Sequence, residues 1–404
     1  MTPFTYRCTD CGRTYSRDEV RYLCPECGKA YRPGIPLLGV LEAVFDYEAI
    51  HRDFDRSKPD WNLFCPVETE FHPPIPVGHT PLGRVDRLGA ALGVESLWVK
   101  NDGLNPSGSL KDRASFLVVA EARRLGMDLI VAASTGNAAS ALAAVCASVG
   151  MKALIFVPEK APKAKLVQMV LYGATVVPIR GTYDDAFALS LAYTEQRGGL
   201  NRNTAYHPLT IEGKKTAGLE IWAQLGFQVP EAILVSVGDG VILGGVHKAF
   251  VDLKRAGLID RLPRLIGVQA DSSDSIHRYV ETGHYSDAAN PVTRADSISV
   301  TCPSNAHSAR RAIQESQGLT LTVTDEEILE AQAMLASRTG IFTEPAGATA
   351  LAGLVKLQGG SRKLGASGPV VILATGHGLK DVEAPLARIS IPPAVEPNLT
   401  SLSL

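Results

Sequence analysis

The residues of this chain that could do covalent chemistry gather at positions 105–113, which read Asn-Pro-Ser-Gly-Ser-Leu-Lys-Asp-Arg. Asn, Pro, Ser and Gly in succession favour a tight loop, and the apolar residues at 114–121 indicate a buried helix. Lys111 therefore lies where the loop becomes the helix, where free backbone N–H groups and the helix dipole disfavour its ammonium form. A lysine with a lowered pKa can form a Schiff base with an aldehyde. The same residues also fit a surface lysine in a solvated cluster with Asp112 and Arg113.

Two Cys-x2-Cys pairs form a second candidate site, and their cysteines are Cys8, Cys11, Cys24 and Cys27. Two such turns can place four thiolates tetrahedrally around zinc. Protein would fill all four positions, so this zinc would be structural; the alternative is a ribbon that has lost its metal. A nucleic-acid-binding ribbon is disfavoured, because basic residues barely outnumber acidic ones up to Arg32.

Composition narrows the class of protein. The chain has 404 residues, of which 45% are hydrophobic and 37 are glycine, and this favours an α/β enzyme. The net charge of −2 gives no reason to expect nucleic acid as a partner. No signal peptide or bilayer-long apolar span is evident, so we expect no membrane partner. We expect a cytoplasmic location, and in such a chain seven cysteines, an odd number, favour reduced thiols over a disulfide framework.

The elements that must position these residues alternate between strand and helix. Residues 128–133 and 152–157 read as buried strands, and 137–149 as the helix between them. Alternation of this kind predicts a parallel sheet covered on both faces, with ligands bound beyond the C-terminal strand ends. Further strands are expected at 96–100, 174–177, 232–237, 265–270 and 370–374, and helices at 162–171 and 41–50.

One predicted strand end carries Ser134-Thr135-Gly136-Asn137. Gly136 lets the backbone pass close to a ligand, and the two hydroxyls and the helix N-terminus offer donors suited to a carboxylate. An ordinary helix-capping loop is the alternative.

A second strand end carries a glycine-rich turn at 238–245, whose backbone N–H groups could cradle a phosphate. The turn nearly matches G-x-G-x-x-G, and Asp271 follows the next strand where a dinucleotide fold would have its ribose acid. An NAD-dependent oxidoreductase is therefore an alternative of another class.

In their order along the chain, these motifs resemble those of the tryptophan-synthase-β-like (fold type II) superfamily of pyridoxal-phosphate enzymes, and among them threonine synthase. The element 203–216 and the sequence Thr-Gly-His-Gly-Leu-Lys-Asp at 375–381 belong to the resemblance, which spans most of the chain. It implies two doubly wound parallel-sheet domains plus an N-terminal zinc ribbon. The expected division is a ribbon at 1–34, a larger cofactor-binding domain at 35–110 and 205–392, a smaller domain at 111–204 and a tail at 393–404.

The resemblance also implies roles for individual residues. Lys111 would hold pyridoxal phosphate and act as the catalytic base. The remaining cofactor-binding residues would be Asn137 at the ring hydroxyl, Gly238, Asp239, Gly240, Val241 and Ile242 at the phosphate, and Thr375 at the pyridine nitrogen. Ser134, Thr135 and Gly136 would bind the substrate carboxylate. An anionic Asp239 must point away from the phosphate or cap the turn, and His377 is expected to stabilise a turn.

The implied activity is conversion of O-phosphohomoserine to threonine and phosphate by γ-elimination and β-hydration, in a homodimer. Two positions depart from the family: Ala138 replaces a threonine, and Thr210 replaces the arginine that grips the substrate phosphate. The alternative within the class is therefore β-elimination or β-replacement on another amino acid, as in threonine dehydratase or cysteate synthase.

Overall fold

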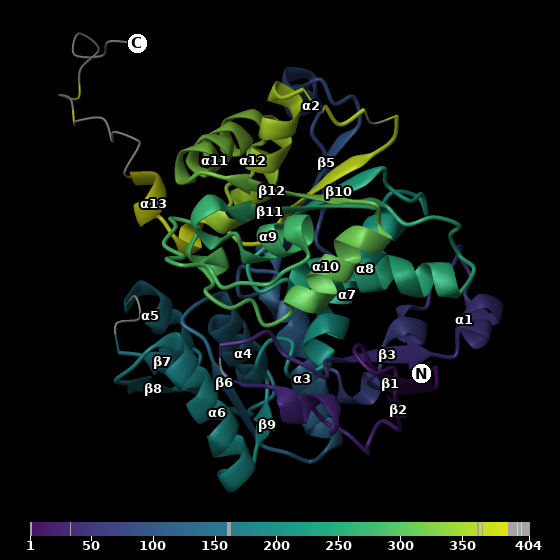
Figure 1. The fold of residues 1–404 in the computed structure, drawn as a ribbon, viewed down its shortest axis with the longest axis vertical. Coiled ribbons are helices and arrows are strands. Elements are labelled where there is room, and N and C mark those ends of the chain that lie inside the picture. Colours follow the sequence, from purple (N-terminus) through teal and green to yellow (C-terminus); the bar gives the residue numbers. More distant parts are fainter. Residues whose placement is uncertain are drawn as a thin grey trace.

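The computed structural model describes residues 2–386, apart from 33, 160–162, 362 and 366, together with 394 and 397. These residues form three sheets covered by helices (Figure 1). The tail expected at 393–404 lies almost entirely outside the described residues.

The largest sheet has six strands in the order β12-β11-β10-β13-β5-β4, and every neighbouring pair is parallel except β4 with β5. The strands are β4 (Leu82–Arg84), β5 (Leu97–Asn101), β10 (Ala232–Ser236), β11 (Arg264–Ala270), β12 (Leu319–Val323) and β13 (Val370–Ala374). The central strands β10 and β13 are buried at every residue. Their continuous apolar sequences are therefore those of strands covered on both faces.

Helices cover both faces of this sheet. Ile233 and Val235 of β10 pack in one core with α7 (Leu209–Gln224), α8 (Val241–Arg255) and α10 (Ala306–Glu315). Leu234, between them in the sequence, packs in the opposite core with α2 (Asp86–Leu92), α11 (Asp325–Thr339) and α12 (Pro345–Gly359). The alternation follows from side chains that point to opposite faces along a strand. The short helices α9 (Ser275–Thr282) and α13 (Glu383–Leu386) complete this part.

A separate parallel sheet of four strands has the order β8-β7-β6-β9. Its strands are β6 (Leu129–Ala133), β7 (Lys152–Pro158), β8 (Thr175–Ile179) and β9 (Leu200–Asn201). One face packs against α3 (Lys111–Arg124), α4 (Asn137–Ala147) and α5 (Lys163–Leu171), and the other against α6 (Tyr183–Arg197). The predicted class, an α/β fold with two doubly wound parallel sheets, is confirmed.

The third sheet belongs to the N-terminal ribbon, and its antiparallel strands are β1 (Phe4–Cys8), β2 (Thr14–Tyr15) and β3 (Leu41–Phe45). The helix predicted at 41–50 is wrong in its first half, because β3 pairs along its full length with β1. Helix α1 (Tyr47–Asp53) begins only after Asp46, whose side chain accepts a hydrogen bond from the Ala49 N–H. Pairing with a distant strand has overridden the local helical preference.

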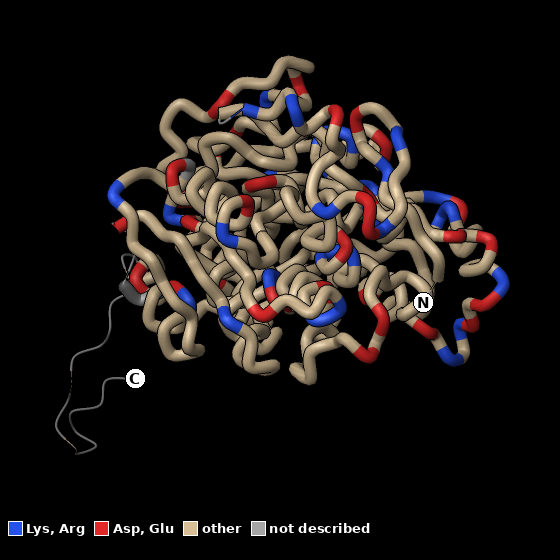
Figure 2. The backbone as a smooth tube through the Cα atoms, turned by 90° about the horizontal axis from the view of Figure 1, so that it is seen from below, with Lys and Arg blue, Asp and Glu red and all other residues tan. Residues whose placement is uncertain are grey.

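Basic and acidic residues are interspersed along the backbone (Figure 2). In the part of the chain that the structure describes, no helix has both the length and the apolar character needed to cross a membrane.

Candidate active site

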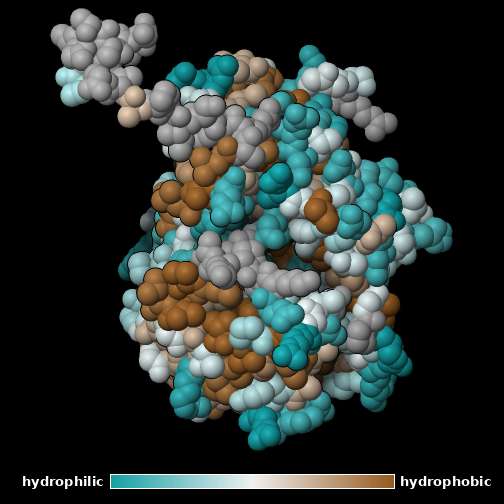
Figure 3. Space-filling view, turned by 90° about the vertical axis from the view of Figure 1, so that its left-hand side faces the viewer, coloured by the Kyte–Doolittle hydropathy of each residue, from teal (hydrophilic) through white to brown (hydrophobic). Residues whose placement is uncertain are grey.

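A cavity of about 380 Å³ lies where C-terminal strand ends of the two parallel sheets face each other. Figure 3 shows a hollow on the side of the molecule that carries α5. Every residue predicted to bind cofactor or substrate lines this cavity: Lys111, Ser134, Thr135, Gly136, Asn137, Gly238, Asp239, Gly240, Val241, Ile242 and Thr375. The structure therefore brings together motifs that lie more than 260 positions apart in the sequence.

Lys111 is the first residue of α3, as predicted. The loop before it is held by Asp112, whose carboxylate accepts hydrogen bonds from the Ser107 N–H at 2.7 Å and the Ser107 hydroxyl at 2.5 Å. Within the described chain the Lys111 amine has no hydrogen-bond or ion-pair partner. Burial lowers its pKa, while the Glu344 carboxylate acts in the opposite direction. A lowered pKa increases the share of neutral amine, the form that attacks an aldehyde.

The solvated charge cluster considered for Asp112 and Arg113 is not what forms, because both side chains are fully buried. Arg113 donates from Nε and Nη2 to the Asp102 carboxylate at 2.6 and 2.9 Å, and from Nη1 to Glu220 Oε1 at 2.6 Å. Lys100 donates to the other Glu220 oxygen at 2.6 Å. This network of hydrogen bonds connects the lysine loop to β5 and α7 and so fixes the position of Lys111.

The loop 134–137 connects β6 to α4 and also lines the cavity. Asn137 is buried, and its Nδ2 donates to Glu344 Oε1 at 2.7 Å and to Ser297 Oγ at 3.3 Å. Glu344 was not singled out as a site residue from the sequence. A carboxylate directly before Pro345, at the start of a helix, was the available signal.

The glycine-rich turn connects β10 to α8, and Gly240 has a positive φ of 83° immediately before the first residue of the helix. A Cβ on Gly238 would lie 2.9 Å from Ile298 Cα, so only glycine lets the segment 296–302 pack against the turn. The first N–H groups of a helix have no partner inside it and suit a phosphate. Asp239 Oδ1 accepts hydrogen bonds from the Ser304 N–H and hydroxyl at 3.2 Å each, so its carboxylate is turned away from these donors.

Two residues of the C-terminal motif separate in space. Thr375, at the end of β13, is buried and lines the cavity. His377 does not line it; its Nδ1 accepts a hydrogen bond from the Leu379 N–H at 3.1 Å, which is the turn-stabilising role expected of it. One cavity is thus lined by the Lys111 amine, by the N-terminus of α8 and by the Thr375 hydroxyl. These groups fit, in that order, the aldehyde, the phosphate and the ring of pyridoxal phosphate.

Two basic residues of this region were missed in the sequence. Lys214 lines the cavity, and Arg202 lies behind Thr204, which lines it. Thr210 contributes nothing to the cavity: its hydroxyl donates to the His207 carbonyl at 2.7 Å and accepts from the Ala205 N–H at 3.0 Å. The extra lysine in the sequence Glu-Gly-Lys-Lys-Thr at 212–216 was the available signal.

The four N-terminal cysteines converge, since their sulfur atoms all lie within 4.8 Å of one another. Cys8 and Cys24 are buried, while Cys11 is exposed. The cluster is compatible with a zinc ribbon.

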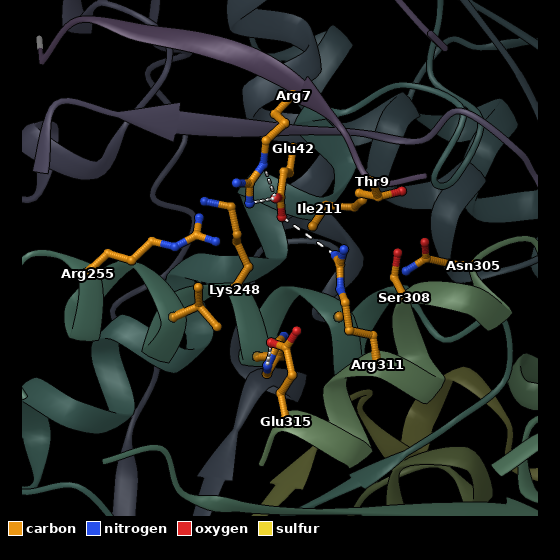
Figure 4. A pocket seen from close by; sticks show the side chains of 13 residues that line it. Arg7, Thr9, Glu42, Ile211, Lys248, Arg255, Asn305, Ser308, Arg311 and Glu315 are labelled. Carbon is orange, nitrogen blue, oxygen red and sulfur yellow. Dashed lines mark hydrogen bonds and ion pairs between the residues drawn. The ribbon is translucent and has the colours of Figure 1, made fainter. Parts of the chain in front are cut away.

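A second cavity, of about 70 Å³, lies between the ribbon and helices α8 and α10 (Figure 4). Glu42 of β3 stands among its basic side chains; it accepts a hydrogen bond from Arg7 and lies 3.6 Å from Arg311. Lys248 is likewise paired, with Asp252 at 2.5 Å. These charges satisfy one another, so the cavity is a contact between the ribbon and the body of the protein rather than a catalytic site.

This fold and this cavity correspond to a class of enzymes that hold pyridoxal phosphate on a lysine at the C-terminal strand ends of a parallel sheet. The family described as pyridoxal-phosphate dependent enzyme matches residues 75–376. The threonine synthase of Methanosarcina acetivorans is 38% identical to this chain, over 98% of this chain and 97% of the relative. The threonine synthase of Methanocaldococcus jannaschii is 37% identical, over 98% of both chains.

The solved structure of a T.th. threonine deaminase superposes with a TM-score of 0.63 at 28% identity, over 78% of this chain and 95% of that one. The chain belongs to the pyridoxal-phosphate dependent enzymes and, among them, to the threonine synthase family. The dinucleotide alternative is not supported, because its glycine turn lines the cavity with Lys111 and its candidate ribose acid, Asp271, is exposed and lies outside the lining.

Proposed function

We propose that this chain is a threonine synthase, which converts O-phosphohomoserine and water to threonine and inorganic phosphate by γ-elimination and β-hydration. The observation that carries the proposal is the match to two threonine synthases along nearly the whole chain. The cavity supports it, since Lys111 and the loop 134–137, which we propose binds a carboxylate, both line it.

In this proposal Lys111 anchors pyridoxal phosphate, the turn Gly238–Ile242 binds its phosphate, Asn137 its ring hydroxyl and Thr375 its ring nitrogen. When bound, the cofactor supplies an electron sink for charge that develops on the substrate. A hydroxyl at the ring nitrogen does not hold a proton there, which favours elimination and replacement over decarboxylation.

The substrate would be held by its carboxylate at Ser134, Thr135 and Gly136, where hydroxyls and a helix N-terminus supply donors. Lys111 is the base for the α proton of the substrate, and burial, which lowers the pKa of its amine, favours the neutral form that this role requires. Since Asp239 accepts hydrogen bonds from Ser304, its carboxylate leaves the N–H groups at the start of α8 to a phosphate.

The test begins with purified protein reconstituted with pyridoxal phosphate. We expect a visible absorption band, fixation of the cofactor on the Lys111 peptide by borohydride, and no band for Lys111→Ala. Lys152→Ala, which changes an exposed lysine at the start of β7, is the control.

Substrates then distinguish the reactions. Release of phosphate and threonine from O-phosphohomoserine supports the proposal. Reaction with threonine, or with O-phosphoserine plus sulfite, and none with O-phosphohomoserine would establish the dehydratase-like or cysteate synthase-like alternative.

We also propose a structural zinc ion on Cys8, Cys11, Cys24 and Cys27. Convergence of the four sulfur atoms supports it. Metal analysis of protein purified without chelator tests it, with about one zinc per chain expected.

A cytoplasmic homodimer is the assembly that we propose. Exposed apolar side chains on α5, namely Val167, Val170 and Leu171, support self-association, and Figure 3 shows apolar residues gathered on this side of the molecule. Light scattering across a concentration series tests it; a monomer at all concentrations contradicts it. The domain division at 1–34, 35–110 with 205–392, and 111–204 remains a prediction that limited proteolysis can test.

A further inference from the structure

The site contains no arginine at position 210 to receive a substrate phosphate, and Thr210 cannot serve instead. Its side chain is completely buried, and its hydroxyl is committed to Ala205 and His207 in the segment before α7. A phosphate ester carries close to two negative charges at neutral pH, so a site that admits one needs cations in its wall.

Among the described residues, two buried cations beside the cavity lack an anionic partner. Lys214 is 1% exposed and has no hydrogen bond or ion pair within that part of the chain. Arg202 is equally buried; its Nε and Nη1 donate to the hydroxyls of Ser115 and Thr204 at 3.2 and 3.1 Å, and its Nη2 has no acceptor. Burying a cation without an anion is costly, which is why such groups mark sites for charged ligands.

Carboxylates near these cations are occupied elsewhere. Asp239 accepts hydrogen bonds from Ser304, and Glu344 accepts one from Asn137. Burial lowers the pKa of Arg202 to about 10 and that of Lys214 well below its ordinary value, Lys214 being further lowered by Lys111 and Arg202. An anion bound between the two side chains would raise the pKa of both toward its ordinary value.

The position of Arg202 favours a substrate group. Arg202 follows β9, and its N–H donates to the Val131 carbonyl at 2.8 Å, while the Asn203 side chain accepts from the Ala133 N–H at 2.8 Å. The residue is therefore adjacent to the end of β6, where the carboxylate-binding loop begins. An amino acid held there by its carboxylate would carry its far end along this wall.

Lys214 reaches the same wall from α7 because two glycines bring three helices together. A Cβ on Gly213 would lie 2.2 Å from the Arg113 carbonyl of α3, and one on Gly245 of α8 would lie 2.8 Å from Lys214 Cβ. Lys111, Lys214 and the helix N-terminus at the glycine turn thus converge on one cavity.

We propose that Arg202 and Lys214 bind the phosphate of the phosphorylated amino-acid substrate, in place of the arginine that position 210 lacks. The inference rests on the proposed function and names its specificity residues. The cofactor phosphate already has the N–H groups of the glycine turn, so these side chains serve a second phosphate.

The test measures phosphate recognition without turnover. The holoenzyme is titrated with 2-amino-5-phosphonopentanoate and with norvaline, which has the same carbon chain without the phosphonate, and binding is followed by the cofactor spectrum. We expect the preference for the phosphonate to fall roughly 10- to 100-fold in Lys214→Met and in Arg202→Met, because each removes a charge-assisted contact. Norvaline affinity and cofactor affinity should not change, and Lys152→Met should behave as wild type.

An unchanged preference in both variants overturns the inference, as does a loss of cofactor affinity in place of phosphonate affinity. A different result is expected if the inference holds but the proposed function is wrong. The wild type would then prefer the phosphonate and the variants would lose that preference, but the wild type would not consume O-phosphohomoserine. The cofactor-free Lys214→Met variant gives a second readout. We expect its melting temperature to equal or exceed that of the wild type, since an apolar side chain replaces a buried amine that has no partner among the described residues; a fall would indicate a structural role for Lys214 and overturn the assignment.

Discussion

Asn137 and Glu344 meet across the active-site cavity, where Asn137 Nδ2 donates a 2.7 Å hydrogen bond to Glu344 Oε1. Asn137 begins a helix on the four-stranded sheet, and Glu344 precedes a helix on the six-stranded sheet. The bond orients the amide: with Nδ2 committed to the carboxylate, Oδ1 is left as an acceptor. Glu344 therefore controls the residue expected at the ring hydroxyl while placing a negative charge near Lys111.

Glu344→Gln should shift cofactor uptake to lower pH. Burial lowers the pKa of Lys111, and the Glu344 carboxylate opposes this effect. Without that charge the pKa of Lys111 falls further, so more amine is neutral at a given pH. The measurement is the rate of colour formation when cofactor-free protein is mixed with pyridoxal phosphate over a pH series. Ser297→Ala, which removes the uncharged neighbour of Asn137, should leave the midpoint in place; a midpoint that rises in Glu344→Gln contradicts the assignment.

Gly213→Ala should destabilise the protein by about 1–3 kcal/mol or more, because overpacking forces shifts in a close-packed interior. The added methyl would collide with the Arg113 carbonyl and with Ala114 Cα, 2.2 and 2.7 Å away. Helix α3 would move relative to α7, so cofactor affinity should fall as well. Gly359→Ala is the matched control, since nothing lies within 4 Å of its added Cβ. Equal unfolding midpoints in urea for the two variants would argue against the collision.

His207 should make the protein less stable in mild acid. Burial lowers its pKa from 6.5 to about 4, so between these values the unfolded chain binds the proton and the folded protein does not. The contribution of His207 is complete above pH 6.5 and declines as the pH falls toward 4, by up to about 3 kcal/mol. His207→Asn keeps an acceptor for the Leu209 N–H, which His207 Nδ1 accepts at 3.2 Å. The free energy of unfolding should depend less on pH in this variant, and identical slopes would contradict the prediction.

Cys11→Ser should remove zinc and lower the melting temperature while leaving bound cofactor unchanged at low temperature. Cys11 is an exposed member of the proposed metal site, so its replacement disturbs no core packing. Metal content and thermal unfolding followed by the cofactor spectrum are the measurements. Cys65→Ser, outside both the cluster and the cavity lining, is the control; loss of colour in Cys11→Ser before unfolding would show that the ribbon shapes the catalytic cavity.

The fold and the walls of the cavity were predictable because their signals are local. The runs 232–236 and 370–374 are apolar at nearly every residue, which indicates strands covered on both faces. The loops that follow them, and the lysine loop, contain the glycines and polar residues that a ligand-binding turn requires. Strand-end geometry then places all of them at one cavity.

What the sequence did not reveal depends on contacts between distant residues. Strand β3 exists because Phe4–Cys8 lies beside it, and no local pattern marks that pairing. The isolation of Lys214 and of Arg202 Nη2 from any anion in the described chain is likewise a property of packing, not of residue order. Glu344 could be recognised as a site residue only when Asn137, 207 positions earlier, was found against it.

The place of β13 between β10 and β5 dictates the order in which the molecule can be assembled during synthesis. Val370 pairs with both Leu97 and Ala232, so β5 and β10 of the larger sheet have no shared neighbour until β13 has left the ribosome. The four-stranded sheet, drawn from one continuous stretch, has no such delay. A nascent chain would therefore complete the four-stranded sheet first. The apolar edges of β5 and β10 that pair with β13 would stay exposed until β13 is made.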